Sequence, residues 1–186
     1  MLALILAAPV VMGSPGPSTV SVTAVGAAFG LRRSLAYTAG LMAGTAGVLL
    51  AVAAGVMAAL LTIPYAQPVL LGASALYILW LAWRIATAPP LADDPGAVAA
   101  PSFVAGFLLA IANPKAWFAI AAVFAGSTVP AAPKVAALIG MIVLIHAAWL
   151  LAGASFARLF RHPTAARVTS IAFALVLVAT AAATVL

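Results

Sequence analysis

The segment Ser14-Pro15-Gly16-Pro17-Ser18-Thr19 interrupts an apolar stretch that carries no charged residue from residue 1 to residue 31. Proline lacks a backbone N–H and its ring clashes with the preceding turn, so two prolines around a glycine cannot continue an ordinary helix. The interruption lies midway between Met1 and Arg32. If the stretch crosses a bilayer, the helix breaks near the midplane of the membrane.

A second interruption, Asn113-Pro114-Lys115, lies near the middle of the apolar segment 102–125. Asparagine is a good helix N-cap, and proline is favoured at the position that follows. Gly16-Pro17 can fill the same two roles in the first segment. Each interruption can therefore end one half-helix and start another.

The composition places both breaks in a membrane protein. Of the 186 residues, 67% are hydrophobic and 5% are charged, whereas a soluble domain has about 25% charged residues. Such a chain is neither a soluble enzyme nor a nucleic-acid binder, although its formal charge is +6. The absence of cysteine excludes disulfides and thiolate metal sites. With two acids and two histidines in the chain, we expect no enzymatic activity, no metal site and no cofactor.

The uncharged runs predict an all-α polytopic membrane protein with six transmembrane helices, because a spanning helix needs about 20 mostly apolar residues. The expected helices cover residues 2–28, 35–61, 67–87, 102–125, 135–157 and 167–185. They form a single transmembrane domain over residues 1–186. It consists of a three-helix repeat at 1–88, a linker at 89–101 and a second repeat at 102–186.

Three spans per half insert the second half upside down relative to the first, so the sequence predicts two inverted repeats with broken helices 1 and 4. Paired broken helices in inverted repeats are the best sequence pointer to the binding site of a transporter. The alternative interpretation is that the prolines only kink the helices for packing.

Basic residues predict the orientation of the chain. Arg32, Arg33 and Arg84 fall on one side of a six-span topology, together with the arginines between the last two helices, Arg158, Arg161 and Arg167. Cytoplasmic loops carry an excess of lysine and arginine. We therefore expect the loops 1–2, 3–4 and 5–6, and with them the linker 89–101, in the cytoplasm. Both termini are expected outside.

The two breaks predict a binding site for an anion at the midplane. Helix N-termini carry partial positive charge, and the restarted half-helices of an inverted repeat point their N-termini at each other. The expected substrate-binding residues are Pro15, Gly16, Pro17, Ser18, Asn113, Pro114 and Lys115. The partners expected from this pattern are a small-molecule substrate and the lipid bilayer, with no nucleic acid; assembly as a homo-oligomer is left open.

Lys115 is the charge that membrane topology does not explain. It lies 12 residues after Phe103, which is about 18 Å along a helix and near the centre of the hydrocarbon core. An intramembrane cation is a functional candidate by default. The sequence offers no intramembrane acid as its partner, so carbonyl groups at the breaks, water or an anionic substrate must serve.

His146 lies equally deep, between Lys134 and Arg158. Histidine has an ordinary pKa of about 6.5 and can carry a proton near neutral pH. His146 is therefore the candidate for proton coupling. A helix–helix hydrogen bond is its alternative role.

The sequence resembles the LysE/RhtB-type amino-acid exporters of the lysine exporter superfamily over nearly its whole length. The resemblance rests on Ser14-Pro15-Gly16-Pro17, the basic turn Gly30-Leu31-Arg32-Arg33, the glycine-rich stretch from Ala39 to Gly44, the helix end Gly72 to Arg84, and Phe103 to Phe107 leading into Asn113-Pro114-Lys115.

This resemblance implies a secondary transporter that exports amino acids or related small metabolites across the bacterial inner membrane, driven by the proton gradient, with both helix breaks lining the site. Many relatives carry an acidic residue or a histidine in the second helix, whereas residues 40–59 have neither. An alternative is a small-anion channel or ion transporter that uses the same cationic midplane site. A non-transporting membrane subunit fits poorly, because paired breaks are costly without a cavity.

Overall fold

The computed structural model describes residues 1–87, 99–155 and 163–185, and all regular secondary structure in these residues is α-helical. The helices are α1 (Leu2–Met12), α2 (Pro17–Ala53), α3 (Val56–Thr62), α4 (Ala66–Ala86), α5 (Phe103–Ala112), α6 (Pro114–Ala125), α7 (Ala131–Ser155) and α8 (Pro163–Val185). The predicted all-helical class is confirmed for these ranges. Most of the predicted linker, its two acids, and the basic residues Arg158, Arg161 and His162 lie outside them.

Both predicted helix breaks are present. The first helix ends at Met12, and the chain resumes helical geometry at Pro17, which follows the extended residue Gly16. The second break is sharper in sequence, because Asn113 alone separates α5 from α6. These two helices bend by 62° at that residue. Proline is the first residue of the restarted helix in both cases.

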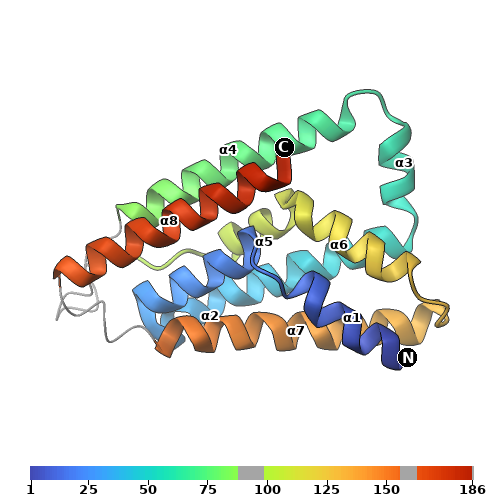
Figure 1. Ribbon diagram of the computed structural model, residues 1–186, viewed down its shortest axis with the longest axis horizontal. Helices are drawn as coiled ribbons and strands as arrows, with labels where there is room; N and C mark the ends of the chain where they lie inside the picture. The colour runs from blue at the N-terminus through green and yellow to red at the C-terminus, as the bar shows by residue number, and fades with distance from the viewer. Residues whose placement is uncertain (88–98, 156–162, 186) are drawn as a thin grey trace.

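Gly30 divides α2 into two segments that run in opposite directions, residues 17–29 and 31–53 (Figure 1). Its φ of 72° and ψ of 171° are not helical, and only glycine adopts this combination readily. Ser34 donates a hydrogen bond to the Val25 carbonyl at 3.0 Å. Nine residues of one straight helix would rise about 13.5 Å, so this bond requires that the chain folds back at Gly30.

The second predicted helix, 35–61, starts within four residues of the observed position but is wrong at its end. Helical geometry begins directly after Gly30, since the tight turn leaves no loop, and it ends at Ala53. A turn at Ala54 and Gly55 follows, with Gly55 in the left-handed region at φ 82°. The residues beyond it form the separate short helix α3. Apolar residues continue through this turn, so hydropathy alone could not locate it.

The remaining helices agree with the predicted segments to within four residues at each end that the structure describes. By length and apolar composition, the stretches of α2 and α7 are each sufficient to cross a membrane, and the bent pair of α5 and α6 is a third span if it is counted as one. Because α2 folds back at Gly30, its two segments are not one straight span. These figures hold for the described residues.

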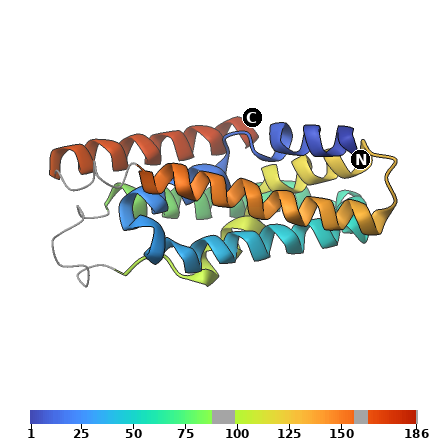
Figure 2. The ribbon, with the colours of Figure 1, turned by 90° about the horizontal axis from the view of Figure 1, so that it is seen from below.

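Close helix packing holds the two breaks in the centre of the bundle. The second segment of α2 crosses α5 where Gly40 faces the backbone of Phe103 and Gly44 faces that of Phe107. A side chain on either glycine would collide with α5, so the small-residue face expected in this helix is used for contact. Helices α4 and α8 lie side by side against this core in both views (Figures 1 and 2).

The ends of the helices gather at two poles. The Gly30 turn, the end of α4, the end of α7 and the start of α8 lie at one pole (Figures 1 and 2). The N-terminus and the α6–α7 connection lie at the other, where Met1 and Ser127 line one shallow pocket. Lys134, at the second pole, is buried and donates hydrogen bonds to the carbonyls of Phe124 and Ser127 at 2.7 and 2.6 Å.

Candidate functional site

The two helix breaks meet in the middle of the molecule. The Asn113 side chain donates a hydrogen bond from Nδ2 to the Ser18 hydroxyl at 2.8 Å. Its Oδ1 accepts the backbone N–H of Lys115 at 3.1 Å, which caps α6. Ser18 belongs to the first turn of α2. One asparagine therefore caps one half-helix and joins its N-terminus to that of the other.

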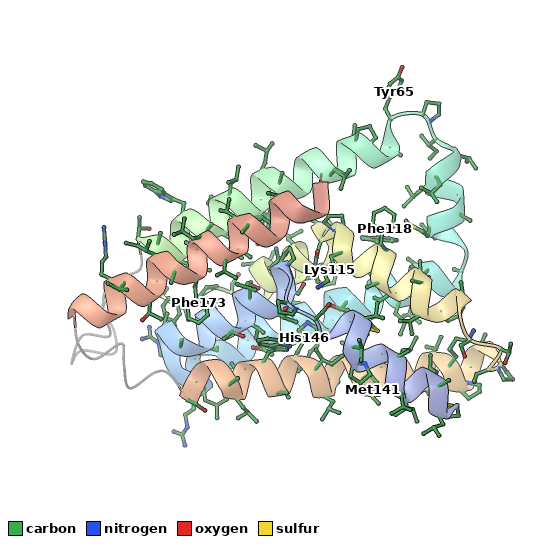
Figure 3. All side chains as sticks on the ribbon, in the orientation of Figure 1. Tyr65, Lys115, Phe118, Met141, His146 and Phe173 are labelled. Carbon is green, nitrogen blue, oxygen red and sulfur yellow. The ribbon has the colours of Figure 1, made fainter. Side chains whose placement is uncertain are left out.

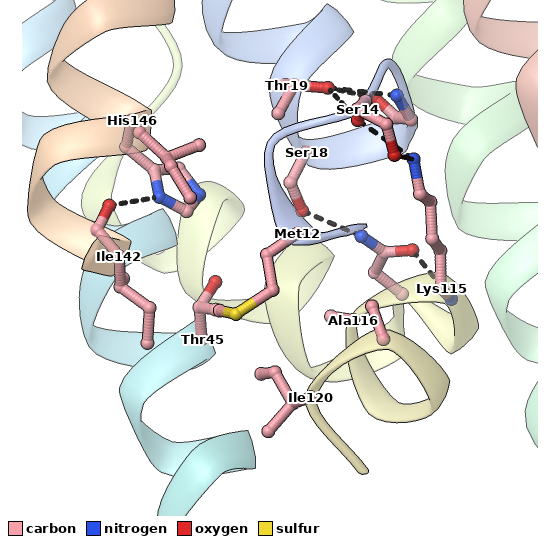
Figure 4. A pocket seen from close by; sticks show the side chains of 14 residues that line it. Met12, Ser14, Ser18, Thr19, Thr45, Lys115, Ala116, Ile120, Ile142 and His146 are labelled. Carbon is pink, nitrogen blue, oxygen red and sulfur yellow. Dashed lines mark hydrogen bonds between the residues drawn. The ribbon is translucent and has the colours of Figure 1, made fainter. Parts of the chain in front are cut away.

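Lys115 extends across the gap to the residues that link α1 and α2 (Figure 4). Its ammonium donates to the Ser14 carbonyl and the Ser14 hydroxyl at 2.8 Å each, and to the Pro15 carbonyl at 2.5 Å. An ammonium has three donors, and all three are used. The sequence left carbonyl groups, water or an anionic substrate as possible partners of Lys115. In the structure, carbonyl groups at the first break take this role.

The link between α1 and α2 is held by side chains from three helices. The indole of Trp149 on α7 donates to the Gly13 carbonyl at 3.0 Å. The hydroxyl oxygen of Thr19 accepts a hydrogen bond from the backbone N–H of Gly16 at 2.9 Å. The N–H of the residue that precedes α2 therefore also has a partner. Hydrocarbon offers no hydrogen-bond partner for backbone groups that a helix break leaves free. Here the partners are side chains of α2, α6 and α7, namely Thr19, Lys115 and Trp149.

A cavity opens beside this link. It takes up about 40 Å³ and is lined by α2, α6, α7 and the end of α1. That volume holds about three water molecules. The lining residues are Met12, Ser14, Gly16, Ser18, Thr19, Thr45, Asn113, Lys115, Ala116, Ala119, Ile120, Ile142, Ile145 and His146.

His146 reaches the cavity from α7, on the side of the link opposite to Lys115 (Figures 3 and 4). The residue is 4% exposed. Its Nδ1 lies 2.8 Å from the Ile142 carbonyl, one turn earlier in the same helix. Its Nε2 is buried and has no hydrogen-bond partner among the residues that the structure describes.

The structure brings most of the predicted site residues together. Gly16, Ser18, Asn113 and Lys115 line the cavity, and so does His146. The three prolines do not line it. The carbonyl of Pro15 binds Lys115, whereas Pro17 and Pro114 are the first residues of α2 and α6.

Sequence reasoning missed two polar side chains from α2, Thr19 and Thr45, that also line the cavity. Thr19 lies inside the interrupted segment and could have been included. Thr45 carries no such signal, because its hydroxyl donates to the Leu41 carbonyl at 2.8 Å as in many helices. The described residues contain no group of three or more metal-ligating side chains.

Comparison with known proteins gives one family. The sequence profile of the LysE type translocator matches residues 10–186. The cysteine/O-acetylserine efflux proteins of Escherichia coli strain K12 and of Shigella flexneri are both 34% identical to the chain over 158 residues, which is 80% of this chain and 80% of each relative. No solved structure matches. The chain therefore belongs to the LysE type translocator family, and it is a membrane transporter rather than an enzyme.

Proposed function

We propose that this protein exports a small neutral amino acid or a related metabolite across the bacterial inner membrane, in exchange for protons. The substrate is proposed to bind in the cavity between the two helix breaks. The observation that carries the proposal is the direct contact of the breaks, through Asn113 with Ser18 and through Lys115 with the α1–α2 link. Membrane proteins tolerate non-helical backbone at depth where it is buried in protein or lines a cavity.

Lys115 is the proposed partner of the substrate carboxylate. A carboxylate carries a full negative charge and forms shorter, stronger hydrogen bonds with an ammonium than a neutral carbonyl does. It can therefore replace the carbonyls of Ser14 and Pro15 as acceptors. That replacement would free the α1–α2 link from α6 and enlarge the cavity around the substrate.

The proposed preference for neutral substrates follows from the cavity lining. It contains a lysine, a histidine, hydroxyls and an amide, but no aspartate or glutamate. A second cationic group, such as the side-chain ammonium of lysine or the guanidinium of arginine, would lack a counter-charge there. The relatives named above are cysteine/O-acetylserine efflux proteins, and we propose that substrate class for this chain.

Alternating access is proposed to come from the two halves of the chain. Each half contains a broken helix, a long helix and a third helix, in that order: α1 with residues 17–29, residues 31–53 and α4, then α5 with α6, α7 and α8. The halves also pack reciprocally, since residues 31–53 contact α5 and α7 contacts α1. This arrangement supports an inverted repeat in which one half rocks against the other.

Efflux measurement tests the proposal. Cells that lack their own exporters and express the chain are loaded with labelled cysteine, O-acetylserine, serine, lysine or arginine, and release is followed with and without a proton uncoupler. We expect uncoupler-sensitive release of the neutral compounds. The competing function, a small-anion channel, predicts chloride flux that needs no amino acid and follows the membrane potential.

Lys115→Ala should lower efflux at least tenfold, because a hydrogen bond to a charged group contributes about 1.5–3 kcal/mol. Lys134→Met is the control, since Lys134 is also a lysine bonded to carbonyls, although more deeply buried than Lys115, and it lies away from the cavity. Both variants are compared at equal membrane abundance. Normal efflux by Lys115→Ala, or an equal loss in both variants, would remove Lys115 from the site.

A further inference from the structure

The buried Nε2 of His146 is the unsatisfied side-chain nitrogen in this cavity. A buried polar atom without a partner costs about 1–3 kcal/mol, so its presence in a built site points to a group that binds there. His146 on α7 and Lys115 on α6 both line the cavity, on opposite sides of the α1–α2 link (Figure 4). The lining therefore contains two nitrogen groups of different character.

The contact at Nδ1 determines that character. The partner of Nδ1 is the carbonyl of Ile142, which can only accept, so Nδ1 carries the hydrogen. In a neutral imidazole the other nitrogen is then an acceptor. Nε2 thus presents a lone pair to the cavity. Lys115 presents donors, and a substrate that satisfies both must have an acceptor at one end and a donor at the other.

The other charged groups near α7 do not compete for this lone pair. Helices α1 and α2 pack against α7. Their titratable side chains Arg32, Arg33 and Tyr37 do not line the cavity, and neither does Lys134 of α7 itself. Lys115, from α6, is the one charged group that shares the cavity with His146 among the described residues.

We propose that Nε2 of His146 accepts a hydrogen bond from the α-ammonium of the substrate, and that this ammonium and a transported proton compete for the same lone pair. The inference rests on the proposed export function and adds to it the residue that binds the amino group of the substrate. Lys115 would bind the carboxylate. Two sites of opposite hydrogen-bonding character select an α-amino acid over a simple anion.

Competition for one lone pair prevents the proton and the ammonium from binding together, and exchange follows when the site reorients only with one of them bound. The substrate leaves Nε2 towards the outside, and one proton from the outside then binds Nε2. The imidazolium has donors only and repels an ammonium, so the site returns inward with the proton. That proton is released to the cytoplasm before the next substrate binds. One proton enters for each zwitterion exported, and each cycle moves one positive charge inward.

Purified protein in liposomes separates the two roles of His146. His146→Gln keeps an acceptor oxygen but holds no proton near neutral pH, whereas His146→Leu has neither property. In counterflow of labelled cysteine without a pH gradient, we expect His146→Leu to raise the KM by on the order of tenfold or more. His146→Gln should keep the KM within a few-fold. Met141→Leu, on the same helix and outside the cavity lining, is the control.

With a pH gradient imposed, uphill transport should be stimulated in the wild type and in Met141→Leu but not in either His146 variant. An unchanged KM in His146→Leu would overturn the ammonium contact. A full response to the gradient in His146→Gln would overturn the proton competition. Absence of any amino-acid counterflow by the wild type would instead contradict the proposed function.

A third measurement uses the wild type alone and so does not depend on the folding of a variant. A hydroxy acid of the same size, such as lactate or glycerate, has the carboxylate but no amine. We expect it to enter the site weakly and to move without proton exchange, which a pH-sensitive dye inside the liposomes detects. Proton movement equal to that seen with serine would overturn the inference.

Discussion

At the residue scale, Gly16 is required for space rather than for backbone freedom. Its φ of −172° is extended, which any residue adopts. A Cβ at this position would lie 2.6 Å from Cδ and 2.9 Å from Nζ of Lys115. Because Gly16 has no side chain, the Lys115 side chain can approach the α1–α2 link closely. The glycine between the two prolines is therefore needed for this contact with Lys115.

Gly16→Ala should lower efflux about tenfold while leaving insertion and abundance unchanged, because the new methyl group displaces the ammonium and its charged hydrogen bonds. Gly140→Ala is the matched control, since a Cβ there meets no atom within 4 Å. Labelled-substrate efflux at equal membrane abundance measures both. Equal efflux from the two variants would show that the close approach of Lys115 to Gly16 is not needed.

At the element scale, the reversal at Gly30 decides how α2 serves the site. The first segment brings Ser18 and Thr19 to the cavity, and the second brings Thr45 to the same cavity from the other direction. A straight helix of 37 residues would be about 55 Å long and would place Thr45 far from the break. The fold back at one glycine thus forms one wall of the site from a continuous stretch of chain.

Gly30→Ala should destabilise the protein by about 1–3 kcal/mol, the usual cost of a non-glycine residue in this backbone region. No atom of the described residues lies within 4 Å of a Cβ there, so the expected cost is conformational and not steric. Thermal unfolding in detergent, followed by tryptophan fluorescence, measures it. Gly72→Ala, in a helix and also without near neighbours, should unfold at or above the wild-type temperature; an equally stable Gly30→Ala would contradict the strained geometry.

At the scale of the whole molecule, the basic residues at the turn after Gly30 lie at the same pole as the ends of α4 and α7 (Figures 1 and 2). The positive-inside rule predicts that this pole is cytoplasmic. The N-terminus and the α6–α7 connection would then face outside. The chain has no cysteine of its own, so single introduced cysteines can report the side of each pole.

Thr128→Cys should react with a membrane-impermeant maleimide in intact cells, because Thr128 is exposed at the pole expected outside. Leu31→Cys, at a position that is 42% exposed beside the Gly30 turn, should react only after the membrane is permeabilised. Mass spectrometry of the purified variants measures the labelled fraction. Labelling in the reverse order would invert the predicted orientation.

Particular residues show how much of this architecture could be predicted. Pro15, Pro17 and Pro114 located both breaks, because the loss of an N–H and the clash of the ring are properties of proline itself. Gly30 lies in the predicted turn between residues 28 and 35, where the arginines mark a loop. Gly55 resembles the other glycines of an apolar chain, and nothing local distinguishes it from Gly40, which only allows close packing. For this reason the sequence predicts the end of the second helix incorrectly.

The sequence by itself determined that the chain is a helical membrane protein with two central breaks, because apolar length and proline chemistry act locally. Tertiary structure alone decided what the central charges contact. It directed all three donors of Lys115 to Ser14 and Pro15, about a hundred residues away, and it left Nε2 of His146 unpaired in the same cavity. The physical reason is that a buried polar atom is satisfied by whatever the packed helices bring within hydrogen-bonding distance, and the order of residues does not specify that.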